Sequence, residues 1–454
     1  MILMNSTPID SEIFKDQFGT KQMRTNFSDE NLIQLWLNSE VALAKAEAKL
    51  GIIPQNAATN IANAADQNKL DFNKIREGMK KTGHPFVAFL HEFESLCDEE
   101  SRKYIHWGAT TQDIIDTGLT LQIKGAHELI YNQTQEILKI CLRLSQQYKS
   151  TVMPGRTLGQ HALPITFGYK ISIWSDELGR HLERLQQGAD RYLVGQLGGA
   201  VGTLASLGAQ GLAVRKEYVK NLNLIEPLVS WHTSRDRFAE FSMILNMIGA
   251  TTAKVAEEII SLQGTEIREV EEGYHSGKVG SSTMPHKRNP MTCSYIVGLT
   301  KIVNRKSTLA IDSMIQKHER DVTFWQSEWS YISEICITLS GALEQLKNVL
   351  TNLIVNEEQM KKNLFLTKGL IVSENVMLEL GKIIGRTTAH DLLYELTMRA
   401  FEEDKDLKDI LLEDNEIKKY FSDEEINSLT NPESYTGLSE KFVDDVYNKW
   451  LSYT

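Results

Sequence analysis

Proline, cysteine and long apolar runs are all scarce in this sequence. Its 454 residues include 9 prolines and 4 cysteines, and the cysteines lie far apart with no CxxC spacing. That distribution argues against a disulfide framework and against a thiolate metal site. Cys97, Cys141, Cys293 and Cys336 are therefore expected to be small buried thiols. No apolar run reaches the roughly 18 residues that a membrane-spanning helix requires, which argues against a membrane protein.

An excess of positive charge is also absent. The chain carries 49 lysines and arginines against 60 aspartates and glutamates, a formal net charge of −11. Because proteins that bind nucleic acid present a basic surface, nucleic acid is not an expected partner. Residues 1–14 show no basic stretch followed by a long apolar one, which argues against a secretory signal. The cytoplasm is therefore the expected location.

Amphipathic helical patterns fill most of the chain. In residues 27–54 apolar side chains recur at alternating steps of three and four, with Ser28 placed to cap a helix and Gly51 to end it. Four further helical patterns far exceed the average length of a globular helix: residues 113–149, 164–193, 237–270 and 334–364. Helices this long need an extended bundle or a subunit interface to bury their apolar stripes.

Strand signals are nearly absent. Few alternating Val, Ile and Thr runs are bounded by hairpin turns, so the sequence predicts an all-α core. The glycines of residues 195–211 follow no strand, which favours an interhelical or active-site loop over a phosphate cradle. The acidic and lysine-rich residues 401–429 are expected to form short solvated helices of a smaller C-terminal unit.

Three polar segments interrupt the helical patterns. They are YIHWGATTQDIIDT (residues 104–117), PGRTLGQHALPITFG (154–168) and GSSTMPHKRNP (280–290), and each combines histidine or serine with glycine. Each alone has a structural explanation, since Thr110 or Thr111 can cap a helix and a lone histidine is often structural. Together, three loops of one chemical type in a helical chain predict one composite cleft.

The third segment carries a family resemblance. GSSTMPHKRNP resembles the signature loop of the fumarase/aspartase superfamily, Gly-Ser-Ser-x-Met-Pro-x-Lys-x-Asn, and the other two segments occur in the family's order. The resemblance extends over essentially the whole chain. The matching loop positions are Gly280, Ser281, Ser282, Met284, Pro285, Lys287 and Asn289.

This resemblance implies an all-α, three-domain fold similar to that of L-aspartase, with a long central helical bundle. We expect a helical N-terminal domain at residues 1–105, the long-helix bundle at 106–355 and a helical C-terminal domain at 356–454. The resemblance further implies a homotetramer whose active sites are shared among three subunits. The expected partner is a small carboxylated substrate, with no metal or organic cofactor.

The implied chemistry removes a proton from the carbon beside a carboxylate and expels a group from the next carbon. Because deprotonation places a second negative charge beside the first, the site must supply cations and hydrogen-bond donors. Lys287 and Asn289 offer both. By the resemblance Ser281 is the general base, and glycines upstream of it give its loop hinge freedom.

The predicted site residues form two groups. The candidate catalytic residues are Ser281, His161 and His106. The candidate substrate-binding residues are His84, Thr110, Thr111, Gln160, Ser282, Met284, Lys287, Asn289 and Arg320. No metal-binding or cofactor-binding residue is predicted, since no HExxH, EF-hand or clustered-cysteine pattern occurs.

Two departures from the adenylosuccinate lyase branch of the superfamily bear on the substrate. That branch carries Arg-Thr-His-Gly in the second segment, with the histidine as general acid, whereas this chain has Leu158 there. After the HERD run this chain has Trp325 and Trp329, where the branch has an arginine that helps to hold a nucleotide phosphate. Either His161 or His106 replaces the missing acid, or the leaving group departs as an anion.

The leading hypothesis is an enzyme similar to adenylosuccinate lyase. It eliminates or adds across a C–N or C–O bond of a succinyl-type polycarboxylate and releases fumarate, with Ser281 as base. Residues 23–54 and 105–117 also resemble 3-carboxy-cis,cis-muconate cycloisomerase, so a lactonising enzyme is the alternative. A non-catalytic member of the fold is a third hypothesis, which Leu158 favours and the complete signature loop opposes.

Overall fold

The computed structural model describes residues 7–274, 277 and 280–454 of the chain. Within these residues the backbone is mainly α-helical, and the strands form two sheets of two antiparallel strands each. The all-α fold class is therefore confirmed. In the same residues no helix combines the length and apolar character needed to cross a membrane. Residues 1–6, part of the segment in which no secretory signal is expected, lie outside the described residues.

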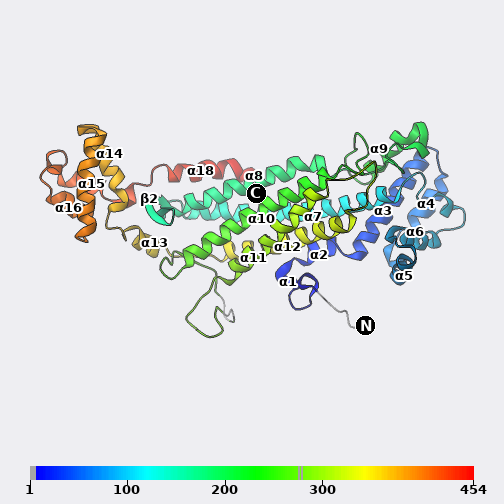
Figure 1. Ribbon diagram of the computed structural model, residues 1–454, viewed down its shortest axis with the longest axis horizontal. Helices are drawn as coiled ribbons and strands as arrows, with labels where there is room; N and C mark the ends of the chain where they lie inside the picture. Colours follow the sequence, from blue (N-terminus) through cyan, green and yellow to red (C-terminus); the bar gives the residue numbers. More distant parts are fainter. Residues whose placement is uncertain (1–6, 275–276, 278–279) are drawn as a thin grey trace. The chain divides into compact units, whose positions relative to one another are not determined.

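Backbone contacts divide the chain into two compact units. Unit 1 comprises Met1–Thr134, His181–Thr252 and Val297–Glu344, and unit 2 comprises Gln135–Arg180, Ala253–Ile296 and Gln345–Thr454. Three of the four predicted long helices are confirmed. The fourth, residues 334–364, is wrong as a single helix, because one helix ends at Thr351 and another begins at Glu357. The three-domain division stays a prediction. The unit boundaries fall within the five long helices of Figure 1: α7 (Thr111–Gln147), α8 (Phe167–Tyr192), α10 (Asp236–Gln263), α11 (Met291–Asp312) and α12 (Trp325–Thr351).

Unit 1 also contains most of the shorter helices of the N-terminal half, and Figure 1 shows α3 to α6 gathered together. The α-helices are α1 (Lys15–Phe18), α2 (Lys21–Asn26), α3 (Asp29–Lys49), α4 (Gln55–Ala64), α5 (Phe72–Thr82), α6 (Pro85–Leu96) and α9 (Gly211–Asn221). The 3-10 helices are η1 (Pro8–Asp10), η2 (Gln67–Lys69), η3 (Ser101–Tyr104) and η4 (Ala205–Gln210).

Helix α3 forms as the sequence predicts. The Ser28 hydroxyl accepts a hydrogen bond from the Asn31 N–H and so caps its start. Gly51 follows its end with a φ of +74°, a conformation that favours glycine. On the buried face, the ring of Trp36 meets that of Phe86 in α6 edge-on, with centroids 5.3 Å apart. This aromatic contact packs α3 against α6.

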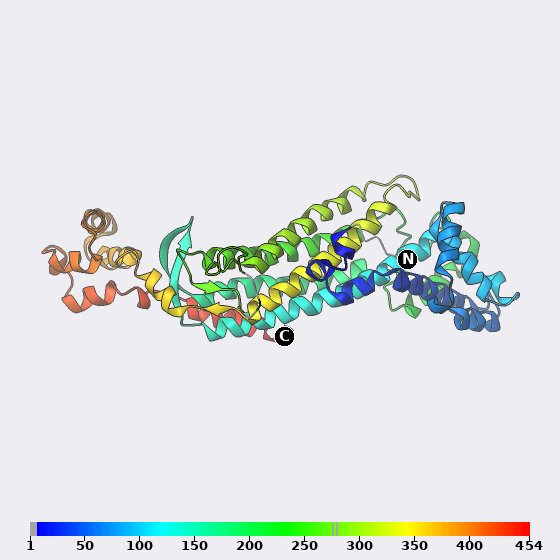
Figure 2. The same ribbon diagram turned by 90° about the horizontal axis from the view of Figure 1, so that it is seen from below.

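Unit 2 holds the strands and the C-terminal helices. In Figures 1 and 2 the orange segments α14 to α16 form one group. The strands are β1 (Val152–Thr157), β2 (Gln160–Thr166), β3 (Val270–Glu271) and β4 (Ile354–Val355). The helices are α13 (Glu357–Leu364), η5 (Leu370–Val372), α14 (Ser373–Ile384), α15 (Arg386–Glu402), α16 (Leu407–Glu413), η6 (Ile417–Lys419), α17 (Asp423–Leu429), η7 (Pro432–Ser434), α18 (Ser439–Trp450) and η8 (Leu451–Tyr453).

The acidic residues 401–429 form short helices, as predicted, but these helices are only partly solvated. Leu407, Ile410 and Phe421 are buried in a cluster with apolar residues of α14 and α15. The expectation of a wholly solvated segment is therefore wrong. Because charged residues outnumber apolar ones in this segment, the sequence pattern does not reveal the apolar face that the helices bury. The four cysteines are buried thiols, as expected.

The second polar segment folds as a β-hairpin and not as a loop between helices. Strands β1 and β2 pair antiparallel around Leu158 and Gly159, whose φ angles are +53° and +81°. Positive φ at both turn residues is typical of a tight two-residue hairpin, which usually carries Asn, Asp or Gly there. Leu158 lacks that signal and each strand contains a proline, so the sequence conceals the hairpin. Helix α8 consequently begins at Phe167, later than predicted.

Candidate active site

Three predicted substrate-binding residues meet where α7 begins. Arg320, which precedes α12, donates hydrogen bonds to the hydroxyl oxygen of Thr110 at 2.5 Å and to that of Thr111 at 2.9 Å. Because both hydroxyls accept from the guanidinium, their own O–H groups remain donors. Cation and hydroxyl donors at a helix N-terminus together suit a carboxylate ligand. We refer to these three residues as the Arg320 group.

His84 lies beside the Arg320 group. It precedes α6, and its ring meets Trp325 edge-on with centroids 6.1 Å apart. Burial, and then the nearby charge of Arg320, lower the pKa of His84. Its buried Nδ1 has no hydrogen-bond partner among the described residues. A neutral His84 can therefore offer this nitrogen to a substrate.

Asp113 connects the first polar segment to the glycine-rich loop. Its carboxylate accepts hydrogen bonds from the backbone N–H groups of Thr110, Gly198 and Gly199, each at 2.9 Å. It also pairs with His232 Nε2 at 2.7 Å, and both side chains are buried. The backbone donors of the glycine loop thus bind the protein's own carboxylate. This use argues against a phosphate cradle, in agreement with the prediction of an active-site or interhelical loop.

His106 is held by a buried carboxylate. Glu40 of α3, which is 1 % exposed, lies 2.7 Å from His106 Nδ1 and accepts from the His106 backbone N–H at 3.0 Å. Burial alone lowers the pKa of His106, but the charge and hydrogen bond of Glu40, with help from Asp113 and Glu94, raise it above its ordinary value. The φ of +58° at His106 is a left-handed conformation that these two bonds support.

A buried ion network fixes the helices that carry the Arg320 group. Arg235 donates to the Asp116 carboxylate of α7 at 2.8 and 3.0 Å and to the Glu328 carboxylate of α12 at 2.8 and 2.6 Å. All three residues are at most 1 % exposed. Because an unpaired buried charge is very costly, the network holds α7 and α12 in one arrangement. Sequence reasoning missed Arg235, as it missed Asp113 and Glu40. The one available sequence signal was for Glu40, an acidic residue directly beside the apolar stripe of residues 27–54.

In unit 2 the hairpin carries two predicted residues, Gln160 and His161. Gln160 is exposed, and His161 is half-buried opposite Arg156. Burial, and then the charge of Arg156, lower the pKa of His161. Arg156 donates to both carboxylate oxygens of the buried Glu269, at 2.9 and 2.6 Å, and Asn363 donates to the same carboxylate at 2.8 Å. His161 thus lies across the hairpin from an arginine that a buried carboxylate fixes in place.

The signature loop lies in unit 2 between β3 and α11. Asn289 donates a side-chain hydrogen bond to the Gly280 carbonyl at 2.7 Å, which joins the two ends of the loop. The Ser281 hydroxyl oxygen accepts from the Met284 N–H at 3.0 Å. Further exposed residues of the loop are Ser282, Met284 and Lys287.

Each unit brings part of the predicted set together. In unit 1 the Arg320 group is joined by hydrogen bonds, with His84 beside it and His106 earlier in the same polar segment. In unit 2 the predicted hairpin and loop residues share no hydrogen bond within the part of the chain that the structure describes. Over the same residues, no group of three or more His, Cys, Asp or Glu side chains is arranged to hold a metal ion.

Comparisons with known proteins extend over the whole chain. A family model described as Lyase matches residues 16–303, and one described as Adenylosuccinate lyase C-terminus matches residues 369–446. An N-acetyl-S-(2-succino)cysteine lyase of Enterococcus italicus is 40 % identical over 98 % of this chain and 98 % of its own length. An adenylosuccinate lyase of Methanocaldococcus jannaschii is 40 % identical over 95 % of this chain and 94 % of its own.

Among solved structures, the 3-carboxy-cis,cis-muconate lactonizing enzyme from Pseudomonas putida is similar with a TM-score of 0.92 and 34 % identity. The match covers 98 % of this chain and 100 % of that chain. The names of these three similar proteins specify three different substrates.

Proposed function

This chain belongs to the lyase family of the fumarase/aspartase superfamily, and on that premise we propose that it cleaves the C–S bond of a succinylated thiol to release fumarate. The predicted superfamily is confirmed, and elimination chemistry is common to the lyases among its relatives. A C–S bond extends the C–N and C–O bonds expected from the sequence. It agrees with the name of the similar lyase from Enterococcus italicus.

In the proposed reaction Ser281 removes a proton from the carbon beside one carboxylate. The C–S bond on the neighbouring carbon then breaks, and its electron pair leaves on sulfur. Fumarate and a thiolate result, and the thiolate takes up one proton. Lys287 and the Arg320 group supply positive charge to the two carboxylates while the carbanion develops.

Leu158 is the observation that carries the proposal. It stands fully exposed at the hairpin tip, where the adenylosuccinate lyase branch has its histidine acid. An amine can leave readily only if it is protonated, and a leucine cannot supply the proton. A thiol has a pKa of about 8.5, so a thiolate departs with far less assistance.

His106 is the better of the two predicted replacement acids. The raised pKa of His106 favours its protonated ring, whereas the lowered pKa of His161 favours its neutral ring. We therefore assign to His106 the positive charge that meets the departing sulfur, and to His161 a hydrogen-bonding role. Trp325 and Trp329, in contact at 5.7 Å between ring centroids, support a substrate without a phosphate.

We also propose a homotetramer in which the signature loop and the Arg320 group that serve one site come from different subunits. The family resemblance and the long bundle helices support this assembly. A cytoplasmic location agrees with the four buried thiols.

A lactonising cycloisomerase is the second candidate function. Leu158 is compatible with it as well, because a carboxylate leaving group also departs as an anion. The similar solved structure from Pseudomonas putida bears that activity in its name.

A comparison of substrates tests these alternatives. The purified protein is incubated with N-acetyl-S-(2-succino)cysteine, adenylosuccinate or 3-carboxymuconate, while fumarate is followed by its ultraviolet absorbance and thiol by titration. We expect equal amounts of fumarate and thiol from the first compound. A higher kcat/KM for adenylosuccinate, or lactone formation from carboxymuconate without fumarate from the thioether, contradicts the proposal.

A further inference from the structure

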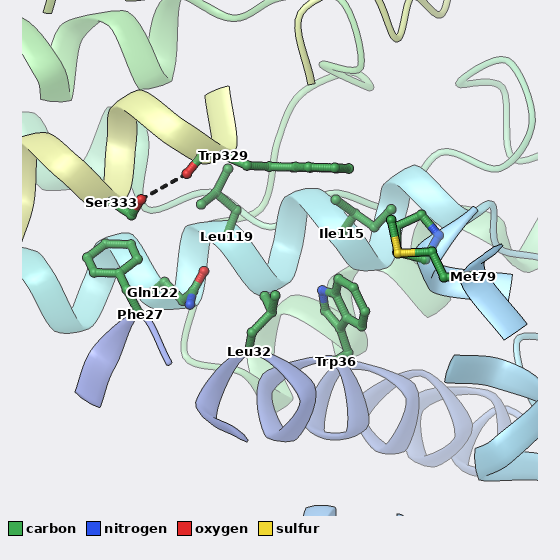
Figure 3. A pocket seen from close by; sticks show the side chains of 10 residues that line it. Phe27, Leu32, Trp36, Met79, Ile115, Leu119, Gln122, Trp329 and Ser333 are labelled. Atoms are coloured by element: carbon green, nitrogen blue, oxygen red, sulfur yellow. Dashed lines mark hydrogen bonds between the residues drawn. The ribbon is translucent and has the colours of Figure 1, made fainter. Parts of the chain in front are cut away.

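An apolar cavity in unit 1 is lined in part by residues that closely follow Thr111 and His84 in the chain. Its volume is about 290 Å³, and Figure 3 shows it between side chains of α3, α7 and α12. The reaction steps proposed above do not use it. The lining residues are Phe27, Leu32, Trp36, Met79, Pro85, Ile115, Leu119, Gln122, Trp329 and Ser333.

The cavity begins one helical turn beyond the substrate-binding threonines. Thr111 is the first residue of α7, and the lining residues Ile115 and Leu119 follow it at steps of four. Side chains at this spacing share one face of a helix, with about 5.4 Å between turns. A ligand held by Thr111 can therefore extend along α7 into the cavity.

The opposite wall of the cavity also begins near the Arg320 group. Pro85 directly follows His84, whose ring contacts Trp325. Trp329, one turn after Trp325, lines the cavity and lies 5.7 Å from that ring. One wall of the cavity thus begins close to Thr111, which accepts a hydrogen bond from Arg320, and the other close to His84, whose pKa the charge of Arg320 lowers.

The cavity contains one buried donor that lacks an acceptor. Trp36 is 6 % exposed, and its indole N–H has no hydrogen-bond partner among the described residues. The pyrrole edge of the ring lies against Gly118 of α7, where a methyl group would approach Nε1 to 2.9 Å. In Figure 3 this nitrogen faces the space between Leu32 and α7. A buried N–H without an acceptor is costly, and a ligand carbonyl can remove that cost.

We propose that the cavity binds the acyl end of an N-acylated leaving thiol. This inference rests on the proposed C–S cleavage and adds the class of thiol. The Arg320 group binds a succinyl carboxylate, the Trp36 N–H binds the amide carbonyl, and the apolar walls bind the acyl chain. At about 30 Å³ for each water-sized group, a cavity of about 290 Å³ accommodates an acyl chain longer than acetyl.

Two matched serine variants and a series of substrates test the proposal. We compare fumarate release from S-(2-succino)cysteines that carry N-acetyl or N-butanoyl groups. Each buried methylene contributes roughly fourfold in binding, and butanoyl has two more methylenes than acetyl, so kcat/KM is expected to rise roughly fifteenfold from acetyl to butanoyl. Ser333→Leu fills the cavity from α12 and is expected to abolish this preference. Ser330→Leu makes the same change one turn away, outside the lining, and is expected to retain it.

A second substitution tests the polar contact. Trp36→Phe keeps an aromatic ring but removes the N–H, so it is expected to raise KM about fivefold for acylated substrates and to leave S-(2-succino)cysteine unaffected. Equal effects on both substrates indicate a merely structural role and overturn the assignment of Trp36.

Direct binding separates this inference from the proposed function. If no succinylated thiol releases fumarate, the C–S proposal fails, and calorimetry with N-acetylcysteine and N-butanoylcysteine still tests the cavity. Tighter binding of the butanoyl compound that Ser333→Leu abolishes supports the acyl site. Equal binding of the two compounds, or equal losses in Ser333→Leu and Ser330→Leu, overturns it.

Discussion

The Arg320 group and the signature loop are built in opposite ways. The threonines of the Arg320 group are held by a buried aspartate and a salt-bridged arginine network, so its donors are already in place. The loop of Ser281 is largely exposed and held by a few hydrogen bonds within itself and to its neighbours. Binding geometry is therefore preorganised in unit 1, whereas the proposed base lies on an exposed segment that few hydrogen bonds hold.

The largest effect is expected from a substitution in the exposed signature loop. Ser281→Ala removes the proposed base, and we expect kcat for fumarate release to fall at least about a thousandfold with little change in stability. Thr283→Ala is the matched control, because its side chain is exposed in the same loop. Near wild-type turnover of Ser281→Ala would falsify the assignment of the base.

The next largest effect is expected from a substitution among the buried residues that support the Arg320 group. Asp113→Ala leaves three backbone N–H groups and His232 without their acceptor. We expect the free energy of unfolding to fall by about 3 kcal/mol, and KM to rise because Thr110 loses its support. Urea denaturation and steady-state kinetics measure the two effects.

Asp190→Ala, an exposed aspartate on α8, is the control for loss of charge alone. If Asp113→Ala unfolds no more easily than this control, the Arg320 group is not preorganised by Asp113.

The contrast between the two regions also explains what could be predicted. Three of the long helices, the Ser28 cap and the signature loop were predictable because each depends on residues close together in the sequence. The loop was the easiest part of the site to find, since its composition differs so strongly from its surroundings.

Buried partners were not predictable, because they are far apart in the chain. Glu40 meets His106, and Arg235 meets Asp116 and Glu328, across dozens of residues that carry no local trace of the contact. The hairpin was missed for a different reason, since Leu158 adopts a turn conformation that leucine rarely takes.

A smaller effect is expected at His106. Glu40→Gln removes the charge that raises the pKa of His106, so burial dominates and the pKa falls below its ordinary value of 6.5. If catalysis needs the protonated ring, the high-pH limb of kcat/KM shifts to lower pH, with about a tenfold loss near neutrality. A pH–rate profile measures the shift, and Glu30→Gln, exposed at the start of α3, is the control.

The stability of the fold is also expected to fall as the pH rises. Because the folded-state pKa of His106 is raised, its stabilisation is complete below about pH 6.5 and is lost as pH rises through the raised value. Glu40→Gln is expected to remove this dependence. A variant whose rate profile and stability keep the wild-type pH dependence contradicts the role of Glu40.

The smallest effect is expected at the hairpin tip. Leu158→His restores the imidazole of the adenylosuccinate lyase branch, and histidine tolerates a φ of +53° better than leucine does. If the leaving group is a thiolate that needs no acid from this position, kcat for the succinylated thiol is expected to change by less than about threefold. Leu158→Ala controls for loss of the apolar side chain. If kcat rises strongly in Leu158→His but not in Leu158→Ala, the missing acid does limit the reaction. That result contradicts a thiolate leaving group and favours an amine.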